Sequence, residues 1–229
     1  MTASGSLDGR NLSCPGSGDM VDLRTYIFID QLQLQMASYI AMVSRGYFPV
    51  AEQACCVIEI SPGIEINRLT DIAVKATDVK PGLQIVERLF GLLEVHSHNQ
   101  GDARQAGNAV LGALDVQEEM RMKPRILTSQ LIKNIDAHHA QLINRTRYGN
   151  MIVKGNTLYI LEIEPAGYAY YAANEAEKAS HINIIEVVGF GRYGRVYIAG
   201  EESEVVVSQD MVEKRLLSIT GREPSGESE

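Results

Sequence analysis

The 229-residue chain carries one sequence pattern twice. When residues 37–95 are laid without a gap over residues 140–198, Glu59, Ile60 and Pro62 fall on Glu162, Ile163 and Pro165, a shift of 103 residues. Further identities at the same shift are Ala37 with Ala140, Ile40 with Ile143, Gly46 with Gly149, Ala73 with Ala176, Lys75 with Lys178, Ala76 with Ala179 and Gly91 with Gly194. Solenoid repeats are usually only ~20–50 residues long. The sequence therefore predicts two related domains joined head to tail.

The amino-acid composition is consistent with two small hydrophobic cores and argues against several classes of binding partner. A chain with 45% hydrophobic residues can bury two domains of about 100 residues each. The formal charge of −8 and the absence of a Lys/Arg cluster argue against a nonspecific nucleic-acid binder. No apolar run approaches the ~20 residues of a membrane helix, and the first residues lack the apolar core of a signal peptide. We expect a cytoplasmic protein with neither nucleic-acid nor membrane partners.

Changes in composition along the chain suggest how it is divided into domains, a connecting stretch and tails. Residues 1–20 are rich in Gly, Ser, Asn and Asp, so we expect a flexible extension. The first domain is predicted at 21–120 and the second at 121–219, followed by a polar tail at 220–229. The polar stretch 115–124 would connect the two domains.

Hydrophobic periodicity predicts the same elements in each copy. A β-rich run (56–60 and 157–164) and a proline corner precede a helix with apolar spacing of 3, 4 and 3 residues. Two short strands then form a hairpin, 83–86 with 91–97 and 184–188 with 195–200, and an amphipathic helix ends each copy. A leading helix is predicted from Ile29, Leu32, Met36, Ile40 and Val43, with Ile132, Ile135, His139, Ile143 and Thr146 as counterparts. The fold class is α/β (α+β), with a small mixed, mostly antiparallel sheet flanked by helices in each domain.

The three cysteines indicate neither a disulfide nor a metal site. Cys55 and Cys56 are adjacent, which is poor geometry for a disulfide, and no CxxC spacing occurs. Cys14 lies in the Gly/Ser-rich extension. We interpret Cys55 and Cys56 as buried, inert thiols in a reducing compartment.

Other motifs compete for a functional interpretation. Gly189, Gly191 and Gly194 spell GxGxxG, but a strand follows, whereas a dinucleotide loop must open a helix. His96 and His98 alternate near a strand end with no third ligand. His138 and His139 are adjacent on a helix and point apart, so no metal site is predicted. Glu59 and Glu162 recur at equivalent places, which a duplicated structural position explains more simply than catalysis does.

Four long segments resemble those of a known family in the same order. They are IEISPGIEINRLTDIAVKA (58–76), PGLQIVERLFGLLEVHS (81–97), QLINRTRYGNM (141–151) and LYILEIEPAGYAYYAANEAEKAS (158–180). The sequence resembles the tandem-domain bacterial microcompartment shell proteins, in which two circularly permuted shell domains are fused. The similarity covers roughly residues 22–219 and is closest to the gated, stacking members first associated with carboxysome shells.

This resemblance implies an assembly rather than an enzyme. Such proteins form homotrimers that imitate a hexamer and tile with other shell proteins, hexamers and pentamers, around encapsulated enzymes. The subgroup stacks two trimers face to face and holds a central pore open or shut. Small polar or anionic metabolites would pass, and no cofactor is implied, since neither predicted pore turn contains the cysteine that binds an iron–sulfur cluster in a related subgroup.

The family pattern also assigns candidate site residues. Glu87 and Arg88 match the acidic and basic pair of the pore gate, and their counterparts at the same shift are Phe190 and Gly191. The two copies thus differ at the one turn where the pore requires a difference. Without the resemblance, Glu87 and Arg88 are ordinary charged turn residues.

Lys75 and Lys178 match the lysine with which a tile meets its neighbour. The helix dipole alone also favours lysine near a helix end, so the edge role follows from the resemblance and from the presence of lysine in both copies. A function of another class also stays open, namely a soluble ligand-binding or regulatory module with a pocket between its two copies. No constellation of residues supports catalysis.

Overall fold

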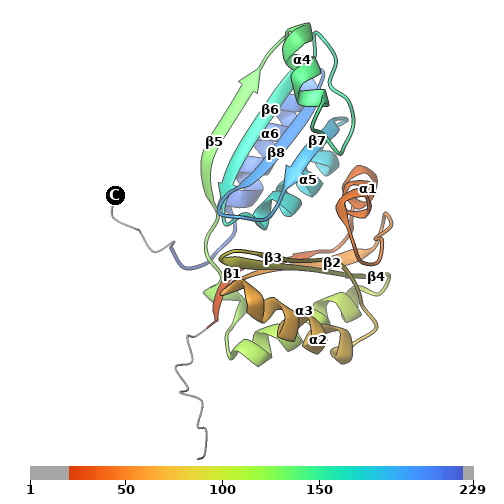
Figure 1. The fold of residues 1–229 in the computed structure, drawn as a ribbon. Helices are drawn as coiled ribbons and strands as arrows, with labels where there is room; N and C mark the ends of the chain where they lie inside the picture. The colour runs from red at the N-terminus through yellow and green to blue at the C-terminus, as the bar shows by residue number, and fades with distance from the viewer. Residues whose placement is uncertain (1–20, 224–229) are drawn as a thin grey trace, which may run out of the picture.

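The protein, studied as a computed structural model, is described over residues 21–223. It contains two four-stranded sheets with the same topology (Figure 1). Sheet 1 has the order β1-β2-β4-β3, with β1 Asp22–Ile29, β2 Ala54–Ser61, β3 Lys80–Glu87 and β4 Phe90–Ser97. Sheet 2 has the order β5-β6-β8-β7, with β5 Arg125–Ile132, β6 Thr157–Glu164, β7 Asn183–Val188 and β8 Gly194–Gly200. Every pairing between these strands is antiparallel, which confirms the predicted small, mostly antiparallel sheets; neither sheet contains a parallel pair among the described strands.

Each sheet carries two long helices on one face. The helices are α1 Leu34–Val43, α2 Ile66–Ala76, α3 Gln100–Leu114, α4 Ala137–Asn144, α5 Tyr168–Ala179 and α6 Glu202–Leu217. Helices α2 and α3 lie beneath sheet 1, and α5 and α6 lie behind sheet 2 (Figure 1). The predicted proline corners are confirmed: Pro62 precedes a short 3₁₀ turn, Gly63–Glu65, that leads into α2, and Pro165 stands just before α5. Both prolines follow cis peptide bonds, which is a further match between the copies.

The predicted leading helices are too long. Ile29 ends strand β1 and Leu32 lies in the following loop, so α1 begins only at Leu34. In the second copy Ile132 ends β5, Ile135 lies in a loop, and α4 begins at Ala137. The apolar spacing of 3 and 4 residues continues from helix into strand by coincidence. Each copy therefore opens with a strand that the pattern missed.

Strand β2 is buried on both faces and divides the core into two layers. Its alternate residues Cys56, Ile58 and Ile60 face α2 and α3, whereas Cys55 and Val57 face the second half of the chain. The adjacent cysteines therefore point to opposite sides of the sheet, and both are free and buried, as predicted. Burial raises the pKa of Cys56 to about 12, which leaves the thiol protonated and unreactive. Cys14 and the predicted flexible extension lie outside the described residues.

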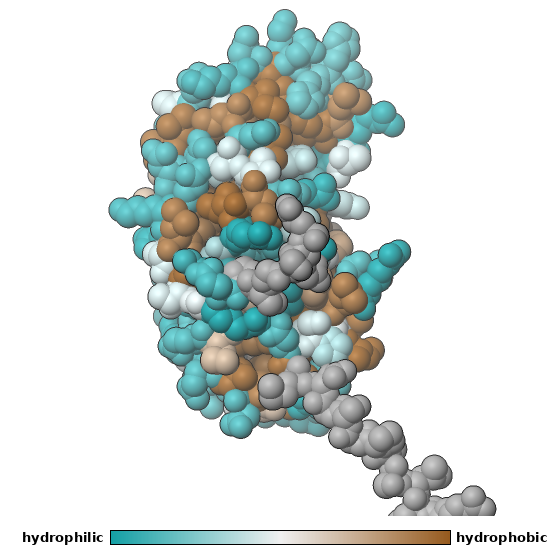
Figure 2. Space-filling model, turned by 90° about the vertical axis from the view of Figure 1, so that its left-hand side faces the viewer, coloured by the Kyte–Doolittle hydropathy of each residue, from teal (hydrophilic) through white to brown (hydrophobic). Residues whose placement is uncertain are grey.

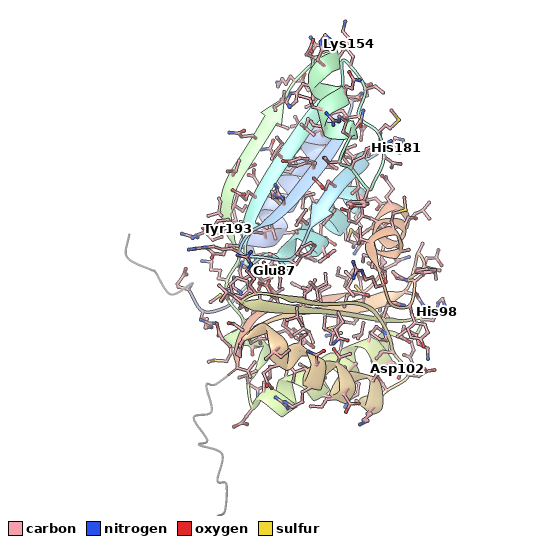
Figure 3. The ribbon with its side chains drawn as sticks, viewed as in Figure 1. Glu87, His98, Asp102, Lys154, His181 and Tyr193 are labelled. Carbon is pink, nitrogen blue, oxygen red and sulfur yellow. The ribbon has the colours of Figure 1, made fainter. Side chains whose placement is uncertain are left out.

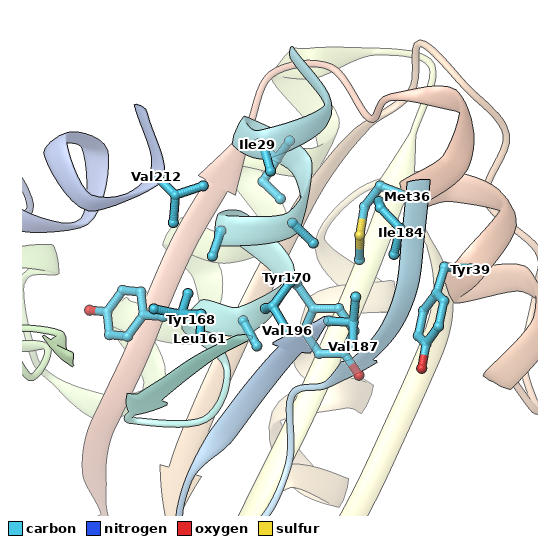
Figure 4. Close-up of a cluster of buried hydrophobic side chains, with 14 of the residues drawn as sticks. Ile29, Met36, Tyr39, Leu161, Tyr168, Tyr170, Ile184, Val187, Val196 and Val212 are labelled. Atoms are coloured by element: carbon cyan, nitrogen blue, oxygen red, sulfur yellow. The ribbon is translucent and has the colours of Figure 1, made fainter. Parts of the chain in front are cut away.

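One continuous core joins the two halves. Ile29, Met36 and Tyr39 from the first half pack with Tyr168, Tyr170 and Ile184 from the second, among others (Figure 4). The first half thus lays β1, α1 and the free face of sheet 1 against α5 and β7 of the second. This contact fixes how the two hairpin turns are placed relative to each other.

The connection between the halves is anchored. Arg121 is buried and donates from Nη1 to the Tyr26 carbonyl oxygen (2.9 Å) and from Nε to the Thr220 carbonyl oxygen (3.0 Å). Beside it, Met122 forms a parallel β-bridge with Arg222, in the part of the predicted polar tail that the structure describes. The linker and the end of the second domain therefore hold each other in place.

Candidate functional site

The first hairpin turn joins β3 to β4. The sequence predicted both Glu87 and Arg88 in this turn. Arg88 lies in it and is exposed, whereas Glu87 is the last residue of β3 and is half-buried. Leu89 follows with 65% of its side chain exposed, while its carbonyl oxygen accepts from the Gly63 amide (2.9 Å). Behind the turn, the Arg24 guanidinium stacks on the Phe90 ring at 3.9 Å. The base of the turn is thus fixed while its tip is free.

The second turn joins β7 to β8 and has a different chemistry. Phe190 is 41% exposed, and Gly191 has φ of +93°, a conformation that favours glycine. Gly189 lies against the Tyr170 ring so closely that a Cβ there would come within 2.1 Å of it. These glycines therefore allow the chain to form a tight hairpin that leads into strand β8. Because a strand and not a helix follows them, they do not form a dinucleotide-binding loop.

The two turns lie at the same end of the molecule. Figure 3 places Glu87 and Tyr193 close to one another at the end of β3. A cavity of about 550 Å³ between the halves is lined by both Val86 and Phe190, the neighbours of these turns. The structure thus brings Glu87, Arg88, Phe190 and Gly191 together at one end of the contact between the halves.

Sequence reasoning missed one residue of these turns. Arg192 stands in the second turn at the position equivalent to Leu89, and its guanidinium lies 5.3 Å from the Tyr193 ring. The second turn thus also carries a cation, as Arg88 does in the first turn. The comparison of the two copies at the shift of 103 residues also covers this position, so Arg192 could have been found there.

The two candidate edge lysines have different surroundings. Lys75 lies in the last turn of α2, is largely exposed, and pairs with Asp71 at 2.6 Å. Lys178 lies in the last turn of α5 and is 28% exposed, because its Nζ reaches Asp30 of the first half at 2.9 Å and Glu175 at 3.2 Å. Lys178 therefore lies at the seam between the halves. Lys178 also holds the pKa of the Asp30 carboxyl below its usual range.

A buried ion pair stands behind the first turn. The Glu59 carboxylate accepts from Arg24 Nε (2.9 Å), Thr25 Oγ1 (3.1 Å) and, across the seam, the Gly167 amide (2.7 Å). Burial raises the pKa of Glu59, and Arg24 opposes that rise. At the equivalent place in the second copy Glu162 is only half-buried. Glu59 is a structural link between the halves.

The histidine pair is not arranged as a metal site. His96 is buried in β4, and its Nδ1 lies 3.1 Å from the Glu94 carboxylate, whereas His98 lies beyond the strand and is exposed. Burial raises the pKa of Glu94, and the hydrogen bond from His96 partly offsets this. Across residues 21–223 no group of three or more His, Cys, Asp or Glu is placed to hold a metal ion. None of the helices described is long and apolar enough to cross a membrane.

Comparison with known proteins identifies the family to which this fold belongs. Residues 23–120 match the family model of the CsoS1D N-terminal domain. The chain is 53% identical over 207 residues to the carboxysome shell protein CcmP of Synechococcus elongatus, covering 90% of this chain and 97% of that protein. It is 42% identical to the carboxysome shell protein CsoS1D of Hydrogenovibrio crunogenus, covering 89% of this chain and all of that protein.

Two solved structures share the whole architecture. The fused permuted hexameric shell protein MSM0275 from the RMM microcompartment matches with a TM-score of 0.84 and 40% identity, covering 87% of this chain and 100% of its own. The double ringed trimeric shell protein MSM0271 from the same microcompartment matches with a TM-score of 0.86 and 37% identity, covering 89% and 100%.

Two fused domains of this kind define a structural shell component, not an enzyme. The chain belongs to the tandem-domain bacterial microcompartment shell proteins of the carboxysome type, the group that includes CcmP and CsoS1D. Its place is in the shell of the microcompartment.

Proposed function

We propose that the chain forms a homotrimer whose six domains imitate a hexamer, and that this trimer is a shell tile with a gated central pore. The observation that most directly supports this proposal is that two domains of equal topology present two unlike turns at one end of the molecule. Three such chains around an axis give three copies of each turn. The similarity to MSM0271, a trimeric shell protein, supports this arrangement. We propose the division between the domains at about residue 120, within the connecting stretch 115–124.

The proposed gate consists of Glu87 and Arg88, with Phe190 and Gly191 beside them. Pairing of each Glu87 with an Arg88 across the axis cancels charge and fills the opening, whereas outward movement of the turns lets water solvate both groups. A partly exposed ion pair is worth only ~0.2–1 kcal/mol. Three pairs therefore hold the closed state by at most a few kcal/mol, which a metabolite or a packing contact is able to overcome.

The same proposal assigns partners and cargo. Lys75 and Lys178 would lie near the tile edge, where other shell proteins, hexamers and pentamers, adjoin. Small polar or anionic metabolites would pass the pore, because three guanidinium groups surround it. Two trimers would stack face to face; the similarity to MSM0271, a double ringed shell protein, supports stacking for this chain.

The size of the particle in solution tests the tile. We expect a mass of about three times 25.2 kDa, or twice that for a stacked pair, by light scattering coupled to gel filtration. Mixing with hexameric shell protein should then give sheets or closed shells in electron micrographs. A monomer that forms neither would contradict the proposal and favour the ligand-binding module.

Replacing both Glu87 and Arg88 with alanine is expected to leave the trimer intact and to open the pore. The turn tip is exposed, so the fold loses little, while the pairs that close the pore are gone. If the closed state is favoured by about 1–3 kcal/mol, most particles should change from closed to open. Sorting of single particles by electron microscopy measures the open fraction. The Arg192→Ala variant is the control at the neighbouring turn, and a double variant that stays closed would remove the gate assignment.

A further inference from the structure

The same bulge interrupts the hairpin of each half, but it is filled differently. In β3 the register of the strand pair shifts at Gly82, and in β7 it shifts at the equivalent residue, Ile185. Ile185 fills its bulge with its own side chain, in one apolar cluster with Ala199. Gly82 has no side chain, and a Cβ there would collide with Glu94 Oε2 and come within 3.3 Å of His96 Cε1. One bulge is thus packed with apolar groups and the other with two ionisable groups.

Glu94 and His96 form a buried pair. Neither residue is more than 1% exposed, and His96 Nδ1 lies 3.1 and 3.3 Å from the two oxygens of the Glu94 carboxylate. A buried site favours a pair without net charge, which is the case when the two groups together carry one proton. An apolar filling serves the same bulge in the second half, so the fold itself does not require an ionisable pair at this place.

The other ionisable groups around the pair do not exchange protons near neutral pH. Cys55 of β2 is opposite His96 in the strand register, and Tyr170 of α5 lies near Glu94. Burial raises the pKa of the Cys55 thiol and that of the Tyr170 hydroxyl, so both stay protonated. Lys80 of β3 is exposed and pairs with Asp78 at 3.0 Å. The neighbouring elements also carry Tyr39 on α1, Arg45 and Tyr47 after it, Lys178 on α5 and Glu186 on β7.

Three hydrogen bonds hold the segment that follows α1 to the bulge of β3. The Gly46 amide, at 3.2 Å, and the Ser44 hydroxyl donate to the carbonyl oxygen of Gly82. The Tyr47 amide donates to the carbonyl oxygen of Pro81 at 2.9 Å. The position of this segment therefore depends on the conformation of the bulge.

This segment, residues 44–47, contributes to the cavity between the halves. Arg45 within it and Leu83 beside the bulge both line the cavity. Helix α1 lies on the right in Figure 1, and the hairpin turns lie on the left, the side onto which Figure 2 looks. Figure 3 shows Glu87 and His98, which follows β4, at opposite ends of sheet 1. The bulge therefore acts on the cavity from the end opposite to the turns.

We propose that Glu94 and His96 together hold one proton and act as a pH-sensitive clasp on the bulge at Gly82. While the proton is held, on the carboxylate or on the imidazole, the pair has no net charge and segment 44–47 stays in place. Loss of the proton leaves a buried negative charge that only water can solvate. Water reaches the carboxylate when the segment lifts, because the Tyr47 carbonyl oxygen borders the same space beside Gly82. The inference does not depend on the proposed trimer or gate.

The direction of the pH effect follows from the pKa of Glu94. Burial raises this pKa, and the hydrogen bond from His96 and the amides of Gly82 and Leu83 oppose the rise. A group whose pKa is higher in the closed state stabilises that state at low pH, and this contribution is lost as the pH rises through the raised value. The clasp should therefore be closed in acid and open progressively above the ordinary carboxyl range, with one proton released per opening.

Hydrogen exchange of the full chain at a series of pH values tests the clasp. The reporters are the amides of Gly46 and Tyr47. The internal controls are those of Gly149 and Asn150, which bond to the apolar bulge in the same way, at 2.9 and 2.8 Å. After correction for the intrinsic exchange rate, the opening equilibrium of the reporters should rise with pH by up to about tenfold per unit, the limit for release of one proton. The controls should stay constant. If both segments respond alike to pH, the clasp is overturned, and this comparison needs no variant.

Replacing Glu94 with glutamine identifies the titrating group. The amide has nearly the size of the carboxylate and still meets His96, but it exchanges no proton, so the rise in reporter exchange with pH should disappear. Asp78→Asn is the matched control, because it removes an exposed carboxyl that pairs with Lys80 and should leave the rise unchanged. A rise that persists in Glu94→Gln would show that another group titrates, and it would overturn the proposal.

Discussion

Replacing Glu59 with glutamine is expected to lower the free energy of unfolding by about 3–5 kcal/mol. Arg24 and Glu59 are both buried, with side chains 8% and 1% exposed. Arg24 Nη2 is buried without a hydrogen-bond partner, so the carboxylate is the main compensation for the guanidinium charge. A neutral amide leaves that charge buried and uncompensated, and weakens the acceptor of the Gly167 amide across the seam. Urea denaturation at matched protein concentration measures the change.

The second copy supplies the control for this prediction. Glu162 occupies the equivalent strand position but is only half-buried, and Leu127 stands where the first copy has Arg24. Glu162→Gln therefore leaves no buried charge without a partner, and it should change the free energy of unfolding by less than about 0.5 kcal/mol. Equal effects of the two substitutions would show that the ion pair contributes little and that Glu59 acts only through its size and polarity.

The fold was predictable where the two copies repeat the same local pattern. The central helices, the hairpins and the two sheets follow from apolar spacing and from the shift of 103 residues. Strands β1 and β5 were missed for a physical reason. Strand β1 is covered by α3 on one face and by α5 on the other, so nearly all its residues are buried and it lacks the alternation that marks a half-exposed strand. Ile29 and Leu32 then extend the helical spacing of α1.

The positions of the two hairpin turns were predictable, but the contacts between the halves were not. The resemblance to the family singled out Glu87 and Arg88, and the comparison of the copies added only that the two turns differ. The seam between the halves depends on contacts with no local signature. Glu177 caps α1 from 142 and 141 residues away in sequence, and Glu59 reaches Gly167 from 108 residues away. Such pairs depend on how the domains pack, which periodicity within either domain does not encode.

Replacing Tyr170 with alanine should be the other large effect, a loss of about 3–5 kcal/mol in the free energy of unfolding. Tyr170 is fully buried in the core that joins the halves (Figure 4), and its ring lies directly on Gly189. Removing the ring leaves a cavity between the two halves and also removes the side chain against which Gly189 of the second turn packs. We therefore expect the variant to loosen the halves and to disorder the turn that carries Phe190, which hydrogen exchange of the 189–193 amides measures.

Two control variants distinguish the contribution of the Tyr170 ring to stability from that of its hydroxyl group and from that of its position in the helix. Tyr170→Phe keeps the packing and should cost less than about 1.5 kcal/mol. Asn67 is the equivalent residue of α2 and is exposed, so Asn67→Ala removes no buried ring and should change the free energy of unfolding by about 0.5 kcal/mol or less. If Tyr170→Ala is no more costly than Asn67→Ala, the halves are held by the ion pair and the helix cap rather than by their shared core. The position of the second turn then depends on those polar contacts, and the Glu59 variant, not the Tyr170 variant, should be the one that disorders it.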